Sequence, residues 1–200
     1  APLPDITLGC SNYLQLIGAG VSEFSKLSIV CLDADVEKQF SNKKPKPKTV
    51  VLLPGHLPPD QLIFEYLYNL PANHDYWNND LQFTREVFTN TASEVIRELS
   101  ISGANVDINN KVTEYKSHMT GSEKDKNKKA REIFKRFYKS EDFQKLCSSL
   151  SKSYNPWKHW IENNLDASND FLQNFEHAIR SVMAGGYAVD ANKLAALKVN

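Results

Sequence analysis

The sequence predicts an α/β fold, in which a small core with a parallel sheet is followed by a helical extension. Two runs predict the sheet: "KLSIVCL" at 26–32 and "TVVLLPG" at 49–55 are short, apolar and bounded by turn residues. Such runs are typical of central strands buried on both faces of a parallel sheet. Beyond Pro71 the strand signal ends and apolar residues recur at helical spacing, which predicts the extension.

The same observations divide the chain into three parts. We expect the α/β core at 1–71, the helical extension at 72–184, and a flexible or vector-derived tail at 185–200. A chain of 200 residues is long enough for one compact core with a helical appendage.

Helices flank the two strands in the predicted core. Ser11 is a suitable cap for a first helix, whose apolar residues share one face: Tyr13, Leu14 and Ile17. The lysine- and proline-rich segment 42–48 predicts an exposed loop between the strands. After the second strand, Pro59 and Asp60 begin another helix, which Pro71 ends.

The helical extension is predicted from apolar residues that share one face of a helix. This spacing occurs in four segments, 84–102, 126–140, 155–164 and 171–183. Trp157 and Trp160 are expected to pack into the core of these helices.

Charge is distributed unevenly along a chain whose net charge is zero. Between Lys111 and Lys152 there are twelve Lys and Arg against six Asp and Glu, and segment 42–48 is a second basic run. Such runs can bind a polyanion, although a solvated helix face and a solvated loop are their ordinary explanation. The candidate DNA contacts in these two regions are Lys43, Lys44, Lys128, Arg131 and Arg136.

The cysteines and the hydropathy point to a cytoplasmic protein. Cys10, Cys31 and Cys147 form no CxxC pair, so a zinc site or a disulfide framework is not indicated, and we expect buried free thiols in a reducing compartment. No apolar run approaches the ~20 residues of a membrane-spanning helix, and no signal peptide is recognisable. We therefore expect no membrane contact.

Two acids follow the first predicted strand. In "SIVCLDADV", Asp33 and Asp35 are separated by one residue, so in a strand both carboxylates would project to one side. The carboxyl ends of strands border the functional crevice of open α/β sheets, and Mg²⁺ accepts one or two carboxylates together with water and phosphate oxygens. The sequence therefore predicts a magnesium or manganese site, with solvated loop residues as the alternative.

Three quoted segments, "DITLGCSNYLQLI", "SKLSIVCLDADV" and "TVVLLPGHLPPDQLIFEYLYNLP", resemble in their order the Toprim domain of the overcoming-lysogenization-defect (OLD) family. Related ATPase-linked anti-phage nucleases share this pattern, in which LDxD ends a central strand and an LPG…PP[DE] segment supplies the next strand and helix. "KKAREIFKRFY" and "NPWKHWIENN" resemble the helical extension of those proteins, so the resemblance covers most of the chain.

The resemblance implies an endonuclease that hydrolyses the phosphodiester bonds of DNA with a bound metal ion. Asp33 and Asp35 match the metal ligands of the D-x-D motif, and Asp60 is the best placed acid for a second ion. A lysine of the extension would neutralise charge in the transition state, and Lys135 is preferred to Lys129. The alternatives are a helix-start acid for Asp60 and backbone contacts or plain surface positions for the lysines.

The chain also departs from the pattern of the family. Members begin with an extra strand that ends in a glutamate, and "APLPDITLG" starts too late to contain it. We therefore expect the carboxy-terminal fragment of a longer defence protein, weak or inactive when isolated, with its ATPase module in the same chain or in trans. The sequence is also compatible with a homo-oligomer. The competing hypothesis is a non-catalytic protein-interaction module with the same α/β and helical parts.

The histidines show no spacing that indicates a metal site. His118, His159 and His177 are scattered, and His74 lies in a polar loop. His56 follows the second strand, close to the expected metal, where a turn residue is the ordinary interpretation.

Overall fold

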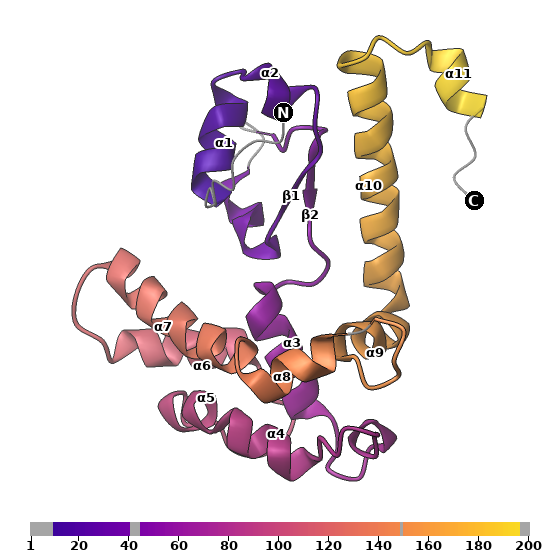
Figure 1. Cartoon of the computed structure of the whole chain (residues 1–200). Helices are drawn as coiled ribbons and strands as arrows, with labels where there is room; N and C mark the ends of the chain where they lie inside the picture. The colour runs from indigo at the N-terminus through magenta and orange to yellow at the C-terminus, as the bar shows by residue number, and fades with distance from the viewer. Residues whose placement is uncertain (1–9, 41–44, 149, 197–200) are drawn as a thin grey trace. The chain divides into compact units, whose positions relative to one another are not determined.

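The computed structural model describes residues 10–40, 45–148 and 150–196. Its described part is mostly helical, with a small two-stranded parallel sheet (Figure 1). The contacts divide the chain into two compact units: unit 1 contains the described residues up to His56 and from Asp166 onward, and unit 2 contains Leu57–Leu165. This division differs from the sequence-based boundaries at 71 and 184.

Unit 1 contains the sheet. β1 (Val30–Leu32) pairs with β2 (Val50–Leu52) in parallel, with Val30 opposite Val50 and Leu32 opposite Leu52. Valine and leucine suit a pleated, half-buried surface, and the connection between the strands is long enough for a parallel crossover. The prediction of two parallel strands at these positions is confirmed.

The burial of β1 differs from the prediction. Val30 and Leu32 are buried, but Cys31 between them is exposed, so β1 is covered on one face only. Val50 and Val51 are both buried, which is the pattern expected of both strands. The prediction that Cys31 is a buried thiol is therefore wrong, because neighbouring side chains of a strand point to opposite faces and one face of β1 is open.

The core of unit 1 is small and mainly aliphatic. Helix α1 (Cys10–Gly18) forms where it was predicted, and α2 (Ser22–Ser25) and the 3-10 helix η1 (Ala34–Gln39) complete the segment around the sheet. The buried residues of this core are Leu14, Ile17, Val30, Leu32, Val36 and Val50.

The C-terminal segment belongs to unit 1. It contains α10 (Leu165–Gly185) and α11 (Ala191–Ala196), so part of the predicted flexible tail is helical. Gly186 lies against the carbonyl of Lys26, and the hydroxyl of Tyr187 donates a hydrogen bond to the carbonyl of Leu27 at 3.4 Å. These contacts hold the end of α10 against the segment that leads into β1.

Unit 2 is helical. Pro59 begins α3 and Pro71 follows its end, as predicted, because proline fits the first turn of a helix and cannot continue one. The spacing in 84–102 gives two helices, and two further helices in this unit were not predicted separately, α6 and α8. The helices are α3 (Pro59–Asn69), α4 (Arg85–Thr91), α5 (Ser93–Glu98), α6 (Ile108–Ser117), α7 (Glu123–Tyr138), α8 (Glu141–Cys147) and α9 (Pro156–Asn163), with the 3-10 helix η2 (Asp75–Trp77).

Aromatic rings fill the core of unit 2. Phe64 of α3 is fully buried, and its ring centroid lies 5.9 Å from that of Phe88, 5.6 Å from that of Phe134 and 5.5 Å from that of Phe137. The last two belong to α7, which presents its apolar face to α3 and α5. Trp160 is buried, as predicted for a core residue.

Within the described residues, no helix is both long enough and apolar enough to cross a membrane.

Candidate functional site

Asp33 lies at the carboxyl end of β1. The carbonyl of Leu32 accepts a hydrogen bond from the amide of Leu53 at 2.8 Å, so both strands end at the same edge of the sheet. Asp33 has a polyproline-like backbone, with φ −57° and ψ 145°, and is the last residue before η1. Asp33 and Asp35 are both half-buried. This edge is where parallel α/β sheets bind ligands.

Asp35 lies in η1 and not in the strand. Because η1 begins at Ala34, the two-residue repeat of a strand does not relate Asp35 to Asp33, contrary to the prediction. Aspartate is a poor strand former and favours the start of a turn or helix, which explains why β1 ends here. The two acids remain neighbours at the strand end, and Oδ1 of Asp35 is shielded from solvent.

The chemistry of these donors fits a hard cation. Mg²⁺ or Mn²⁺ takes one or two protein carboxylates and completes its coordination with water or phosphate oxygens. Within the part of the chain that the structure describes, no three His, Cys, Asp or Glu side chains gather closely enough to hold an ion. Two carboxylates are too few for a structural zinc site, which takes four protein ligands.

Asp60 lies in the first turn of α3, in unit 2. Its Oδ1 accepts a hydrogen bond from the amide of Gln61 at 3.0 Å, an arrangement that favours the helix start through the helix dipole. This is the alternative that the sequence left open for Asp60, and its role as a second metal ligand stays a prediction. His56, exposed and preceded by Gly55 with φ +96°, ends unit 1.

The predicted DNA contacts fall in two places. Lys43 and Lys44 lie outside the described residues. The other predicted contacts and both candidate catalytic lysines lie on α7: Lys128, Lys129, Arg131, Lys135 and Arg136. They do not share one face, because residues one apart on a helix are separated by about 100°.

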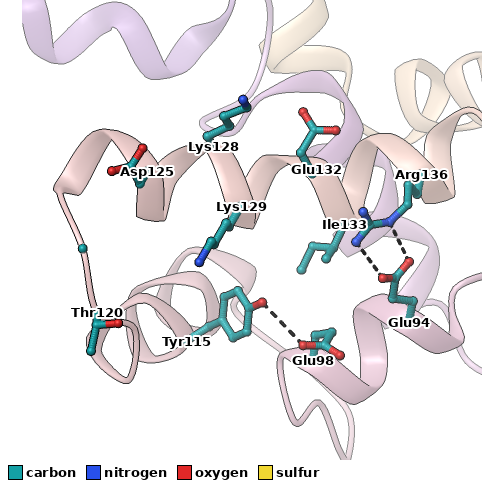
Figure 2. Close-up of a pocket in the computed structure, with 11 residues that line it drawn as sticks. Glu94, Glu98, Tyr115, Thr120, Asp125, Lys128, Lys129, Glu132, Ile133 and Arg136 are labelled. Carbon is teal, nitrogen blue, oxygen red and sulfur yellow. Dashed lines mark hydrogen bonds and ion pairs between the residues drawn. The ribbon is translucent and has the colours of Figure 1, made fainter.

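A pocket of about 730 Å³ lies beside α7, at α5 and α6. Lys129 projects toward Tyr115 in this pocket, and Lys128, whose side chain points upward in Figure 2, also belongs to the lining. The charged side chains in the lining are four acids and three bases, namely Glu94, Glu98, Asp125, Glu132, Lys128, Lys129 and Arg136. The lining therefore carries no surplus of positive charge for a phosphate group.

Arg136 is held by Glu94 across this pocket. Its Nε and Nη2 donate to the two carboxylate oxygens at 2.9 and 2.6 Å, and this interaction raises the pKa of the guanidinium above its ordinary value. Two parallel hydrogen bonds from a guanidinium to a carboxylate are the strongest geometry for such an ion pair. Arg136 therefore connects α7 to α5, a contact that competes with its predicted binding to DNA. Lys135 lies elsewhere on α7, with its Nζ 3.4 Å from Glu132.

A cluster of polar aromatic side chains was missed by the sequence analysis. The hydroxyl of Tyr66 lies 2.6 Å from Nδ1 of His159, and the rings of His159 and His74 are 5.3 Å apart. Burial, followed by the nearby His74, lowers the pKa of His159. Burial also raises the pKa of Tyr66 to about 12. Tyr66 and His74 lie 93 and 85 residues before His159 in the sequence. No local motif could therefore have predicted this cluster.

No family model matches the chain, and neither a curated protein nor a solved structure matches it.

Proposed function

We propose that the chain is the nuclease module of a metal-dependent DNA endonuclease, with Asp33 and Asp35 as the ligands of Mg²⁺ or Mn²⁺. The observation that carries the proposal is the half-buried carboxylate of Asp33 at the edge where two parallel strands end, with Asp35 two residues on. A cation in this position has the surroundings in which open α/β sheets bind phosphate-bearing ligands.

The protein groups have separate tasks in this proposal. Asp33 and Asp35 hold the ion, which would polarise the scissile phosphate and lower the pKa of a bound water. Lys135 is preferred to Lys129 as the lysine that contacts the scissile phosphate. Lys129 is less suitable because it lines a pocket in which acids outnumber bases. Asp60 is proposed as a ligand of a second ion.

The fold and the partners belong to the same proposal. The two-stranded sheet and the helices around it are compatible with a Toprim-like core of the OLD family. The module would work with an ATPase, in the same chain or in trans, in anti-phage defence. Cys31 and Cys147 are free thiols, which supports a reducing, cytoplasmic location.

A non-catalytic interaction module is the second candidate. It is favoured by the position of Asp35 in η1, because an acid in the first turn of a short helix needs no metal to explain it. In that case the α/β unit is a scaffold and the helices of unit 2 bind a partner chain.

Metal binding separates the two candidates. Thermal unfolding is followed while Mg²⁺ or Mn²⁺ is added to the wild type and to D33N and D35N. The melting temperature of the wild type should rise with metal, and that of both variants should not, because each lacks one ionised ligand. E37Q, which removes an exposed acid of the same 3-10 helix, is the matched control and should respond like the wild type.

A flat response of the wild type, or an equal rise in all four proteins, would contradict the metal site. Cleavage of plasmid DNA under the same conditions is the second measurement. Weak cleavage is expected from the chain alone, and it should disappear in D33N and D35N.

A further inference from the structure

Helix α7 carries a continuous row of basic side chains. Counted along the helix, the row advances by four, three, four and four residues. Its members are Lys124, Lys128, Arg131, Lys135 and Lys139, where Lys139 is the helical C-cap residue. At 100° per residue, these intervals keep all five within a sector of about 80°. We call this set the α7 cation row.

The row faces away from the core of unit 2. Of the buried residues of α7, Ala130, Ile133 and Phe137 lie on the opposite side of the helix, and Phe134 lies about 60° around the helix from Arg131. Four members of the row are exposed, and Arg131 is half-buried. A rigid helix packed on an aromatic core therefore displays the row to solvent.

Acids of α7 lie beside the row and not within it. Glu123 and Asp125 are each about 100° around the helix from Lys124. Glu132 lies at the flank, 3.4 Å from Lys135, in an exposed pair that contributes little to stability. The bases that face acids across the pocket, such as Arg136 with Glu94, belong to another side of the helix. The positive charge of the segment is thus concentrated on the row.

The length of the row suits a polymer of regularly spaced anions. Fifteen residues at a rise of 1.5 Å separate its ends by about 22 Å, with successive cations about 4.5 to 6 Å apart. Duplex DNA carries about one negative charge per 1.7 Å of its axis, so a row of this length can face several phosphates. Four of its members are lysines, which bind phosphate as mobile point charges.

We propose that the α7 cation row binds the phosphodiester backbone of DNA without regard to sequence. The inference rests on the proposed nuclease function for its choice of DNA and names the surface that holds this substrate. It adds Lys124 and Lys139 to the contacts, assigns Lys135 to backbone binding, and leaves Arg136 to its pair with Glu94. Backbone contacts position a duplex and carry no sequence information, so unrelated sequences should bind alike.

The test is a binding titration of the whole chain in EDTA, where cleavage is absent. The probes are a fluorescent 20-base-pair duplex, a second duplex of unrelated sequence and a single strand of the same length, each at several salt concentrations. The row variant is K124Q/K128Q/K135Q. The control variant R97Q/K145Q/K158Q removes three charges from other helices of unit 2, each of which pairs with a neighbouring acid.

The row variant should lose roughly tenfold or more in affinity at low salt, and the slope of log K against log salt should fall by about 2.7, which is 0.9 for each lost contact. The control should bind like the wild type, and both variants should retain the wild-type melting temperature. Equal losses in the two variants, an unchanged slope in the row variant, or no binding by the wild type would overturn the proposal.

Binding to anionic vesicles is measured as a further part of the same experiment. If the row variant loses binding to phosphatidylserine vesicles and keeps its affinity for DNA, the row is a membrane surface and the proposal fails. The metal titration is independent of these results: binding through the row without a metal response at Asp33 and Asp35 would contradict the nuclease proposal alone. A metal response without DNA binding would contradict the row alone.

Discussion

Unit 2 buries a large aromatic core, whereas unit 1 buries a small aliphatic one. Four phenylalanines of unit 2 are fully buried, Phe64, Phe88, Phe134 and Phe143. The core of unit 1 is built from aliphatic residues around two strands of three residues each, and one face of β1 leaves Cys31 exposed. A pair of strands that few other side chains cover is only marginally stable, because the pair buries little apolar surface.

The difference separates stability from the candidate chemistry. The acids that we propose as metal ligands belong to the unit with the smaller core, where an ion or a further chain can add stability by binding to the folded state. The α7 cation row belongs to the unit with the rigid core, which fixes the spacing of its charges. Substitutions in each unit can test this contrast.

The largest effect is expected from F64A. Removing a fully buried ring that contacts four others should destabilise unit 2 by about 3 to 5 kcal/mol, through lost burial and the cavity left behind. Hydrogen exchange should show faster exchange throughout 57–165. F175A, which removes a half-buried ring of α10, is the control and should cost less. Equal loss of protection in both units would show that they unfold together, and would break the comparison.

A smaller effect is expected from G186A, in unit 1. A Cβ at this position would lie too close to the carbonyl oxygen of Lys26 and 2.8 Å from that of Val182, so the backbone must shift. Such overpacking costs about 1 to 3 kcal/mol. Chemical unfolding should show this loss, with faster exchange in α10 and in the residues before β1.

The neighbouring glycine supplies the matched control for this substitution. A Cβ at Gly185 meets nothing within 4 Å, so G185A should be neutral or slightly stabilising. An unchanged stability of G186A would indicate that the end of α10 does not pack against this segment in solution.

The smallest effect is expected from pH, through His159 in unit 2. Burial and the nearby His74 lower the pKa of His159 in the folded state, so the unfolded state binds more protons as the pH falls below about 6.5. Stability should therefore be fully present above that pH and decrease as the pH falls toward the lowered pKa.

Melting temperatures between pH 7.5 and 5.5 test this sign. The groups that face His159 are Tyr66, His74, Tyr76 and Glu162. H159Q should show a weaker dependence on pH than the wild type, and H177Q, which removes an exposed histidine of α10, should keep the wild-type dependence. A steeper dependence in H159Q would contradict the assignment.

Several local features could be read from the sequence because short-range chemistry determines them. Pro59 and Pro71 bracket α3, and the apolar runs at 26–32 and 49–55 contain β1 and β2. The apolar spacing in 126–140 identified the buried face of α7, and the same spacing, applied to its lysines, contains the α7 cation row. In each case a proline ring, a run of β-branched side chains or the helical period acts within a few residues.

Other features depended on contacts between distant segments. The exposure of Cys31, the bond between Tyr66 and His159, the pair of Arg136 with Glu94 and the packing of Gly186 against Lys26 each join residues far apart in sequence or depend on what covers a strand. The strand β1 ends at Leu32, and Asp35 lies in a 3-10 helix, which the spacing of the two acids did not predict. The sequence by itself determined where the two strands and several of the helices form, and where charge gathers. Only the fold decided which faces are open and which charges already have partners, because burial and pairing are properties of surfaces that meet in space.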